Sequence, residues 1–207
     1  MNGILEKLFG SAGRVKIIRL FLQNSENSFS LDEISRRAKV LMPLARREIS
    51  VLKSVGLIKQ QEEIFEEVKK LKNGRTKSKK KKATVFVLNL LSPFLHALRN
   101  LVLNVAPIDK EKMVKELNSV GKIKLIVLSG IFIQNDNNRV DLLLVGDSIK
   151  EGKLDKVLKN IEAEIGKEII YAAFKTDDFM YRFGMFDRFI RDILEFPHEK
   201  IINKLNI

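Results

Sequence analysis

Residues 30–58, SLDEISRRAKVLMPLARREISVLKSVGLI, decide how the first half of this chain folds. Ser30 and the glutamate three positions later have the spacing of a capping box, which predicts a short helix over 31–38. Pro43 suits the first turn of a further helix that reaches about residue 55. Gly56 then supplies a left-handed stop, and the apolar residues after it begin a strand. The stretch therefore predicts helix, helix and strand in that order.

The second of these helices has two different faces. Ala45, Ile49 and Leu52 recur at helical spacing and predict a packed side. The opposite side is long, polar and cationic. It carries Arg46, Arg47, Ser50 and Lys53. Such a face is either an ordinary solvated surface or a binding surface.

Four further segments complete the predicted N-terminal domain. Apolar residues at helical spacing over 14–22 predict a first helix. Residues 58–68 and 84–90 predict an outgoing and a returning strand. Between them, residues 69–82 hold nine Lys or Arg residues and no acid. We expect this segment to be a mobile loop, either merely solvated or ordered against phosphates.

The positive charge of the chain is confined to its first half. Residues 1–106 contain 21 Lys and Arg against 9 Asp and Glu, whereas residues 107–207 contain 17 of each. The whole net charge of +12 therefore belongs to one half. This split predicts two domains, and it indicates the DNA phosphate backbone as the partner of the first.

The ending over 48–58, EISVLKSVGLI, resembles the junction between recognition helix and wing in winged-helix transcriptional regulators. The resemblance implies a winged helix-turn-helix DNA-binding domain over residues 1–91, with 69–82 as a long basic wing. The third helix, over about 43–55, would then lie in the major groove. Winged helices that bind protein or RNA are the alternative.

Each cationic residue of this half has an expected role on DNA. Arg46 and Arg47 would read guanine, because a guanidinium matches its two acceptors in one plane. Met42 and Pro43 would meet thymine methyl groups, while Ser50 and Lys53 would hold phosphates. The wing would contact flanking backbone or the minor groove. Its predicted contact residues are Lys72, Arg75, Lys77, Lys79, Lys80, Lys81 and Lys82.

Residues 92–106 predict a connecting helix that begins at Ser92-Pro93 and is apolar on more than one side. Burial against a second subunit would make it a dimerisation helix, in keeping with regulators that pair to read two half-sites. Packing wholly within its own chain is the alternative. Strands and helices alternate after residue 107, which predicts a small α/β domain over 107–207 and an α+β protein overall. From about Asp177 to the end we expect only helices, with Thr176 as their N-cap.

Two stretches of the second half, LSG over 128–130 and RVDLLLVGD over 139–147, resemble the core of the minimal nucleotidyltransferase fold of the polymerase-beta-like superfamily. That family holds two magnesium ions on an Asp-hydrophobic-Asp pair and a third acid. This chain has Arg139 at the first aspartate, and Ser129-Gly130 where the family has Gly-Ser, so only Asp141 remains. The resemblance therefore implies a degenerate domain without catalysis, metal or cofactor. Ser129, Gly130, Arg139 and Asp141 would form at most a vestigial nucleotide pocket.

The segment over 188–195, RFIRDILE, resembles the C-terminal helix of prokaryotic winged-helix proteins fused to such degenerate domains. The chain has no cysteine and no apolar run of membrane-spanning length, which predicts a cytoplasmic protein. We expect a homodimeric DNA-binding transcriptional regulator whose second domain dimerises or senses a nucleotide or small molecule. An active nucleotidyltransferase with a winged-helix targeting domain is the alternative, and an RNA-binding or architectural module is a third possibility.

Overall fold

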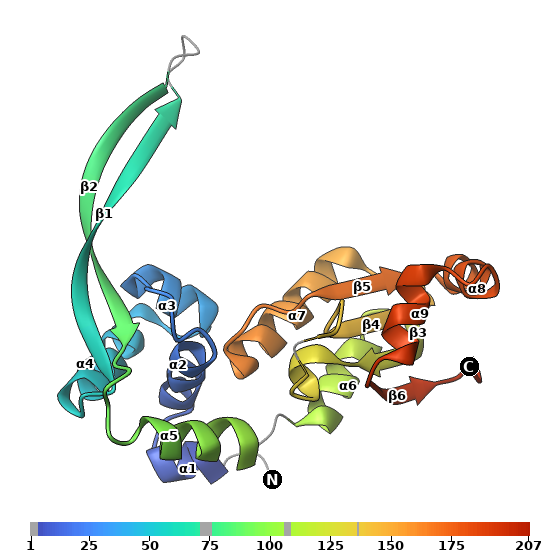
Figure 1. The fold of residues 1–207 in the computed structure, drawn as a ribbon, viewed down its shortest axis with the longest axis horizontal. Helices are drawn as coiled ribbons and strands as arrows, with labels where there is room; N and C mark the ends of the chain where they lie inside the picture. Colours follow the sequence, from blue (N-terminus) through green and yellow to red (C-terminus); the bar gives the residue numbers. More distant parts are fainter. Residues whose placement is uncertain (1–3, 71–75, 106–108, 136) are drawn as a thin grey trace. The chain divides into compact units, whose positions relative to one another are not determined.

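The computed structural model describes residues 4–70, 76–105, 109–135 and 137–207, and it describes no side chains for 65–70, 76–79 and 104–105. The chain divides into two compact units. The first comprises Met1–Ile108 with Ala163–Lys167, and the second comprises Asp109–Glu162 with Glu168–Ile207. Each unit combines helices with one small sheet, so the protein mixes α and β structure (Figure 1).

Four helices open the first unit: α1 Ile4–Phe9, α2 Ala12–Gln23, α3 Leu31–Arg37 and α4 Met42–Ser54. The helices predicted over 14–22, 31–38 and 43–55 are confirmed as α2, α3 and α4, while α1 was not predicted. The capping box is confirmed as well. Ser30 Oγ accepts from Glu33 N at 3.3 Å, and Ser30 N donates to Glu33 Oε2 at 2.8 Å.

The strands β1 Ile58–Lys70 and β2 Thr76–Leu88 form one long antiparallel hairpin (Figure 1). The loop predicted over 69–82 is therefore wrong for its described part, because residues 76–82 are paired in β2. The register explains why the lysine run is tolerated in a strand. Glu66 stands opposite Lys80 and Glu67 opposite Lys79, so the basic strand is paired with an acidic one.

The connection between the units differs from the single helix predicted over 92–106. It consists of the short helix α5 Leu95–Arg99 followed by a π-helical segment, η1 Asn100–Val105. Val102 is fully buried, and Leu95, Leu98 and Leu101 pack partly buried against the same core as α2 and α4. One side of this segment thus packs within its own unit, whereas the residues just before it, Leu90, Leu91 and Phe94, are exposed.

The second unit is built on a four-stranded sheet of order β5-β4-β3-β6, in which only the β4–β5 pair is parallel. Its strands are β3 Lys122–Leu128, β4 Leu142–Asp147, β5 Tyr171–Phe174 and β6 Glu199–Asn203. Its helices are α6 Lys110–Asn118, the short η2 Gly130–Phe132, α7 Glu151–Ile165, α8 Thr176–Gly184 and α9 Arg188–Glu195. The described core gathers central-strand residues around Phe179 of α8 and Ile190 and Ile193 of α9.

Two predictions for the end of the chain are wrong. Residues after α9 are not helical, because Phe196 is extended and Pro197 cannot continue the helix, and β6 then pairs with β3. Thr176 is not the N-cap of α8 but its first residue, and Lys175 occupies the cap position without a side-chain hydrogen bond.

Candidate nucleic-acid interface

Helix α4 separates its apolar and cationic side chains as predicted. Ala45, Ile49 and Leu52 are buried, and Met42 at the start of the helix is half-buried. The remaining predicted contact residues of this helix are exposed. They are Pro43, Arg46, Arg47, Ser50 and Lys53.

A buried ion pair fixes α4 against α2. Glu48, on the packed face of α4, is only 2% exposed, and its Oε2 lies 2.6 Å from Nε of Arg14 on α2. Arg14 Nη1 also donates to the carbonyl of Phe9 at the end of α1, at 2.7 Å. Sequence reasoning missed this pair. The signal was an acid one turn from Ala45 and Leu52 on the apolar side of the helix.

The end of α4 is joined to both strands of the hairpin. Gly56 has φ +71°, its N–H donates to Lys53 O, and Leu57 N–H donates to Leu52 O, which together form a Schellman motif. Asn89 then donates its side-chain amide to Gly56 O and its backbone N–H to Leu57 O, both at 2.8 Å. The exposed face of α4 and the base of the hairpin are therefore held in one arrangement.

The cations of α4 differ in how they are engaged. Lys53 Nζ donates to Oε1 of Gln60 on β1, a second link between helix and hairpin. Arg46 and Arg47 form no hydrogen bond or ion pair with any other residue that the structure describes. Because an unpaired guanidinium keeps all five of its donors, these two side chains are available to an anionic partner.

The hairpin adds further exposed cations on β2. Lys80, Lys81 and Lys82 are exposed, and Lys82 Nζ lies 3.8 Å from Glu62 Oε2 across the ladder. The side chains of Lys77 and Lys79 lie outside the described residues, as do Lys72 and Arg75 altogether. The predicted DNA-contact residues whose side chains the structure describes thus lie on α4 and on the β2 strand.

The residues of the predicted nucleotide pocket are brought together, but their polar groups are used within the second unit. Ser129 is fully buried, and its Oγ donates to the carbonyl of Val140 at 2.5 Å. Asp141 accepts backbone N–H groups through both oxygens, from Ile131 at 2.8 Å and from Ile170 at 2.9 Å. Asp141 therefore holds the turn after β3 to the segment before β5.

Gly130 and Arg139 complete this arrangement. Gly130 has φ +54°, and a Cβ at this position would lie 2.0 Å from Asp141 Oδ1, so only glycine fits beside the carboxylate. Arg139 Nε lies 2.5 Å from Asp192 Oδ2 on α9. Arg139 stands where the resembled family has its first catalytic aspartate. It is thus paired with an acid of its own unit.

No group of three metal-ligating side chains occurs among the residues that the structure describes. Asp147, at the end of β4, is hydrogen-bonded to Lys124 at 2.9 Å, and this bond lowers the pKa of its carboxyl below the ordinary value. Asp147 Oδ1 also accepts from Thr176 N at 3.3 Å. Asp141, just before β4, and Asp147, at its end, are therefore both bound to protein groups.

Within the described parts of the chain, no helix combines the length and apolarity that crossing a membrane requires. Comparison with known proteins yields no match to a family model, to a curated protein or to a solved structure.

Proposed function

We propose that this chain is a DNA-binding transcriptional regulator whose first unit is a winged helix with α4 as recognition helix and β1–β2 as wing. The observation that carries the proposal is the pair Arg46 and Arg47. They are exposed, without a partner among the described residues, and lie on a helix that a buried ion pair and a Schellman motif hold rigidly.

The dimensions of the two elements suit duplex DNA. Helix α4 has 13 residues and is about 20 Å long, which fits the major groove. Each hairpin strand also has 13 residues and extends roughly 43 Å, more than the ~34 Å of one DNA turn. The wing is therefore long enough to follow the backbone beyond the groove that α4 occupies.

The expected division of labour follows from the exposed groups. Arg46 and Arg47 lie in the N-terminal half of α4 and contact base edges, with Met42 and Pro43 beside them. Ser50 and Lys53 lie closer to the hairpin and contact phosphates. Lys80, Lys81 and Lys82 bind the DNA phosphates that flank the groove. The glutamates of strand β1, which pairs with β2, lower the net positive charge of the hairpin.

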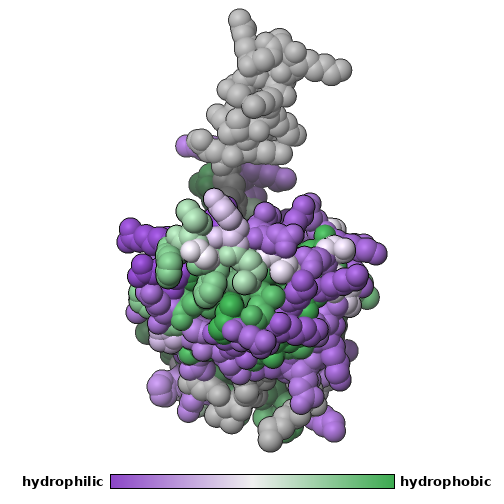
Figure 2. Space-filling model, turned by 90° about the vertical axis from the view of Figure 1, so that its right-hand side faces the viewer, coloured by the Kyte–Doolittle hydropathy of each residue, from purple (hydrophilic) through white to green (hydrophobic). Residues whose placement is uncertain are grey.

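We further propose that the second unit dimerises the regulator. Its helix α8 and the turn after it expose a contiguous set of large apolar side chains, and Figure 2 shows hydrophobic side chains gathered on one face of the molecule. The set comprises Met180, Tyr181, Phe183, Met185 and Phe186. Phe186 is 77% exposed at φ +53°, a position that favours glycine or asparagine.

Sedimentation tests this surface with the substitution Phe186→Asn. Asparagine tolerates a positive φ and removes the aromatic ring, so the variant should fold and yet sediment as a monomer at concentrations where the wild type is a dimer. Phe196→Asn, which removes an exposed aromatic outside this set, is the matched control. A wild type that stays monomeric at all concentrations contradicts the dimer.

The alternative of an active nucleotidyltransferase has less support. Asp141 and Asp147 would have to exchange their protein partners for magnesium, and Arg139 would stand among the ligands. The degenerate transferase-like domain remains our proposal for the second unit.

Selection of bound DNA from a random duplex library, with the full chain at near-physiological salt, tests the proposed function. We expect a two-fold-related motif with half-sites about one helical turn apart. Binding without an enriched motif would indicate an architectural protein instead. A competition experiment between RNA and duplex DNA completes the test. Tighter binding of single-stranded or structured RNA than of duplex DNA would exclude a DNA regulator.

A further inference from the structure

Asn89 follows strand β2 at the corner where the hairpin meets helix α4, and each of its polar groups is hydrogen-bonded. Its backbone N–H donates to Leu57 O at 2.8 Å, and its carbonyl accepts from Ser92 N at 3.0 Å. Its side-chain amide donates through Nδ2 to Gly56 O at 2.8 Å and accepts through Oδ1 from Leu91 N at 3.3 Å. Asn89 thereby connects the end of α4, the start of β1 and the chain that leads to α5.

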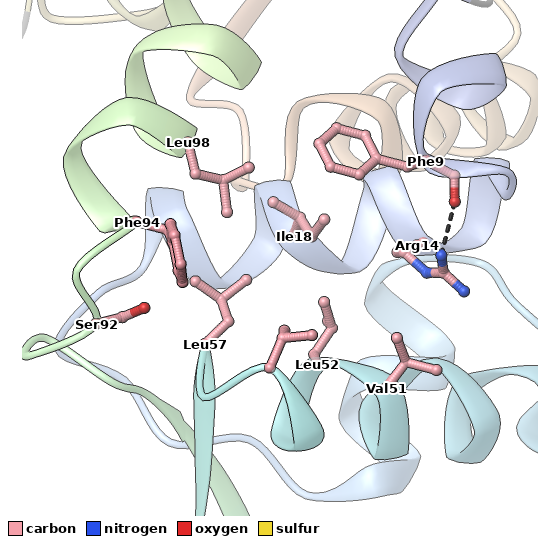
Figure 3. A pocket seen from close by; sticks show the side chains of 10 residues that line it. Phe9, Arg14, Ile18, Val51, Leu52, Leu57, Ser92, Phe94 and Leu98 are labelled. Carbon is pink, nitrogen blue, oxygen red and sulfur yellow. Dashed lines mark hydrogen bonds between the residues drawn. The ribbon is translucent and has the colours of Figure 1, made fainter.

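Side-chain packing is incomplete beside this corner. Leu57 lies on one side of an apolar pocket, and Leu98 of α5 lies on the other (Figure 3). Val55 and Phe94 line the same pocket, and they are 56% and 66% exposed. Closely packed interiors leave few voids larger than a water molecule. The hydrogen bonds of Asn89 therefore hold a corner that packing leaves partly open.

Two further attachments hold the base of the hairpin, one on each strand. On β2, Phe86 exchanges backbone hydrogen bonds of 2.8 and 2.9 Å with Phe29, which precedes α3. This bridge ties the hairpin to the chain before α3 and not to α4. On β1, Gln60 accepts from Nζ of Lys53, but both side chains are long and exposed. The short side chain of Asn89, by contrast, bonds directly to the backbone at the end of α4.

The angle at this corner decides where the hairpin lysines lie. Lys81 is paired with Phe65, seven positions after Ile58, so it lies about 23 Å along the strand from the base of the hairpin. A tilt of roughly 10° at the base would move Lys81 by about 4 Å. Charge-assisted hydrogen bonds to phosphate form only near about 2.7–2.9 Å, so a shift of this size breaks such a contact.

We propose that Asn89 is a positioning residue for DNA binding. Its side-chain amide fixes the angle between α4 and the hairpin, so that the arginines of α4 reach base edges while the hairpin lysines reach phosphates of the same duplex. The consequence for DNA rests on the proposed function, whereas the fixed angle does not.

Distances between two nitroxide spin labels measure the angle without DNA. The chain has no cysteine, so Ser50→Cys on α4 and Lys81→Cys on β2 provide two unique and exposed labelling sites. Pulsed electron paramagnetic resonance of the full chain should give one narrow distance distribution. Adding Asn89→Ala should broaden or shift this distribution, because the amide bonds to Gly56 and Leu91 are lost.

Two further variants isolate the bond to the helix end. Asn89→Asp retains an acceptor for Leu91 N–H but has no donor for Gly56 O, and it should broaden or shift the distribution as well. Ser54→Ala, the control, removes a hydroxyl that donates to Val51 O within α4 and should leave the distribution unchanged. A distribution that neither substitution of Asn89 alters overturns the proposal.

DNA titrations over a range of salt concentrations give the second readout, with unlabelled protein. Asn89→Ala should reduce the slope of log K against log salt by up to about 2.7, the contribution of three lysines, and should retain the base preference of α4. Replacing Lys80, Lys81 and Lys82 by glutamine should then reduce the slope less in the Asn89→Ala background than in the wild type. A purely structural role would lower the melting temperature without this coupling.

The outcomes separate this inference from the proposed function. A slope that Asn89→Ala leaves unaltered, in a chain that binds duplex DNA, overturns the proposal, and so do additive losses from Asn89→Ala and the lysine triple. Absence of duplex binding refutes the proposed function instead, and the label distances then still decide whether Asn89 fixes the angle.

Discussion

The two units use the charge of their arginines differently. Arg46 and Arg47 on α4 and Arg139 just before β4 illustrate the difference. Arg46 and Arg47 have no partner among the described residues, whereas Arg139 is paired with Asp192. Two acids, buried Glu48 and half-buried Asp141, follow the same division of roles. Glu48 supports a helix whose other face is free, while Asp141 joins two backbone segments of its own unit. In the first unit, Arg46 and Arg47 are thus available for binding while the Arg14–Glu48 pair holds the fold; in the second unit, Arg139 and Asp141 both bond within the fold.

The largest expected effect comes from breaking the buried pair under α4. Glu48→Ala leaves Arg14 partly buried without its acid, and we expect a loss of about 3 kcal/mol in the free energy of unfolding. Urea denaturation measures it. Asp155→Ala, which removes the exposed pair with Lys159, is the control and should lose only about 0.3–0.5 kcal/mol. Equal losses in the two variants would contradict a structural role for the Glu48 pair.

The next effect concerns Asp141. Asp141→Ala leaves the N–H groups of Ile131 and Ile170 without their acceptor, and we expect a loss of about 1.5–3 kcal/mol in unfolding free energy. If the carboxylate instead served a metal, magnesium would raise the melting temperature of the wild type and not that of the variant. We expect magnesium to change neither.

Arginine substitutions sharpen the comparison between the units directly. Arg46→Ala or Arg47→Ala should cost about 1–3 kcal/mol in DNA binding at one base position, with the melting temperature unchanged. Arg139→Ala should leave DNA affinity intact and lower unfolding free energy by at most about 1 kcal/mol, since its ion pair is half-exposed. The reverse pattern in anisotropy and melting experiments would place DNA on the second unit.

Neutralising the hairpin lysines tests the wing. Replacing Lys80, Lys81 and Lys82 by glutamine should weaken all DNA sequences alike and reduce the slope of log K against log salt by up to about 2.7. The control triple replaces exposed lysines of the second unit, Lys115, Lys122 and Lys156, and should leave the slope unchanged. An unchanged slope in the hairpin variant would remove the wing from the interface.

The smallest expected effect is a pH dependence at the start of α3. The hydrogen bond from Ser30 N–H to Glu33 lowers the pKa of this carboxyl below its ordinary value. Its contribution to stability is therefore present above the unfolded pKa of about 4.3 and is lost as the pH falls through the lower folded value. NMR titration of Glu33 measures the pKa. Ser30→Ala keeps the backbone N–H and removes only the hydroxyl that also donates to Glu33 Oε2 at 2.8 Å, so it should raise the pKa only part of the way toward the ordinary range. A wild-type pKa of Glu33 at or above its ordinary value would contradict this prediction.

Features that depend on near neighbours could be predicted from the sequence. The capping box needs only Ser30 and Glu33, the stop after α4 needs only Gly56, and the two faces of α4 follow from helical spacing. The confinement of the net charge to residues 1–106 is likewise a property of composition. These local signals determined three helices, the position of the hairpin and the candidate contact residues of α4.

Features that depend on distant partners were decided only by the tertiary structure. The lysine run is a strand because an acidic segment stands opposite it, and β6 exists because β3 offers it an edge. Asp141 likewise bonds to residues 10 and 29 positions away. Spacing within one segment carries no information on such pairings, since hydrogen bonds and burial are set by whichever side chains the fold brings together.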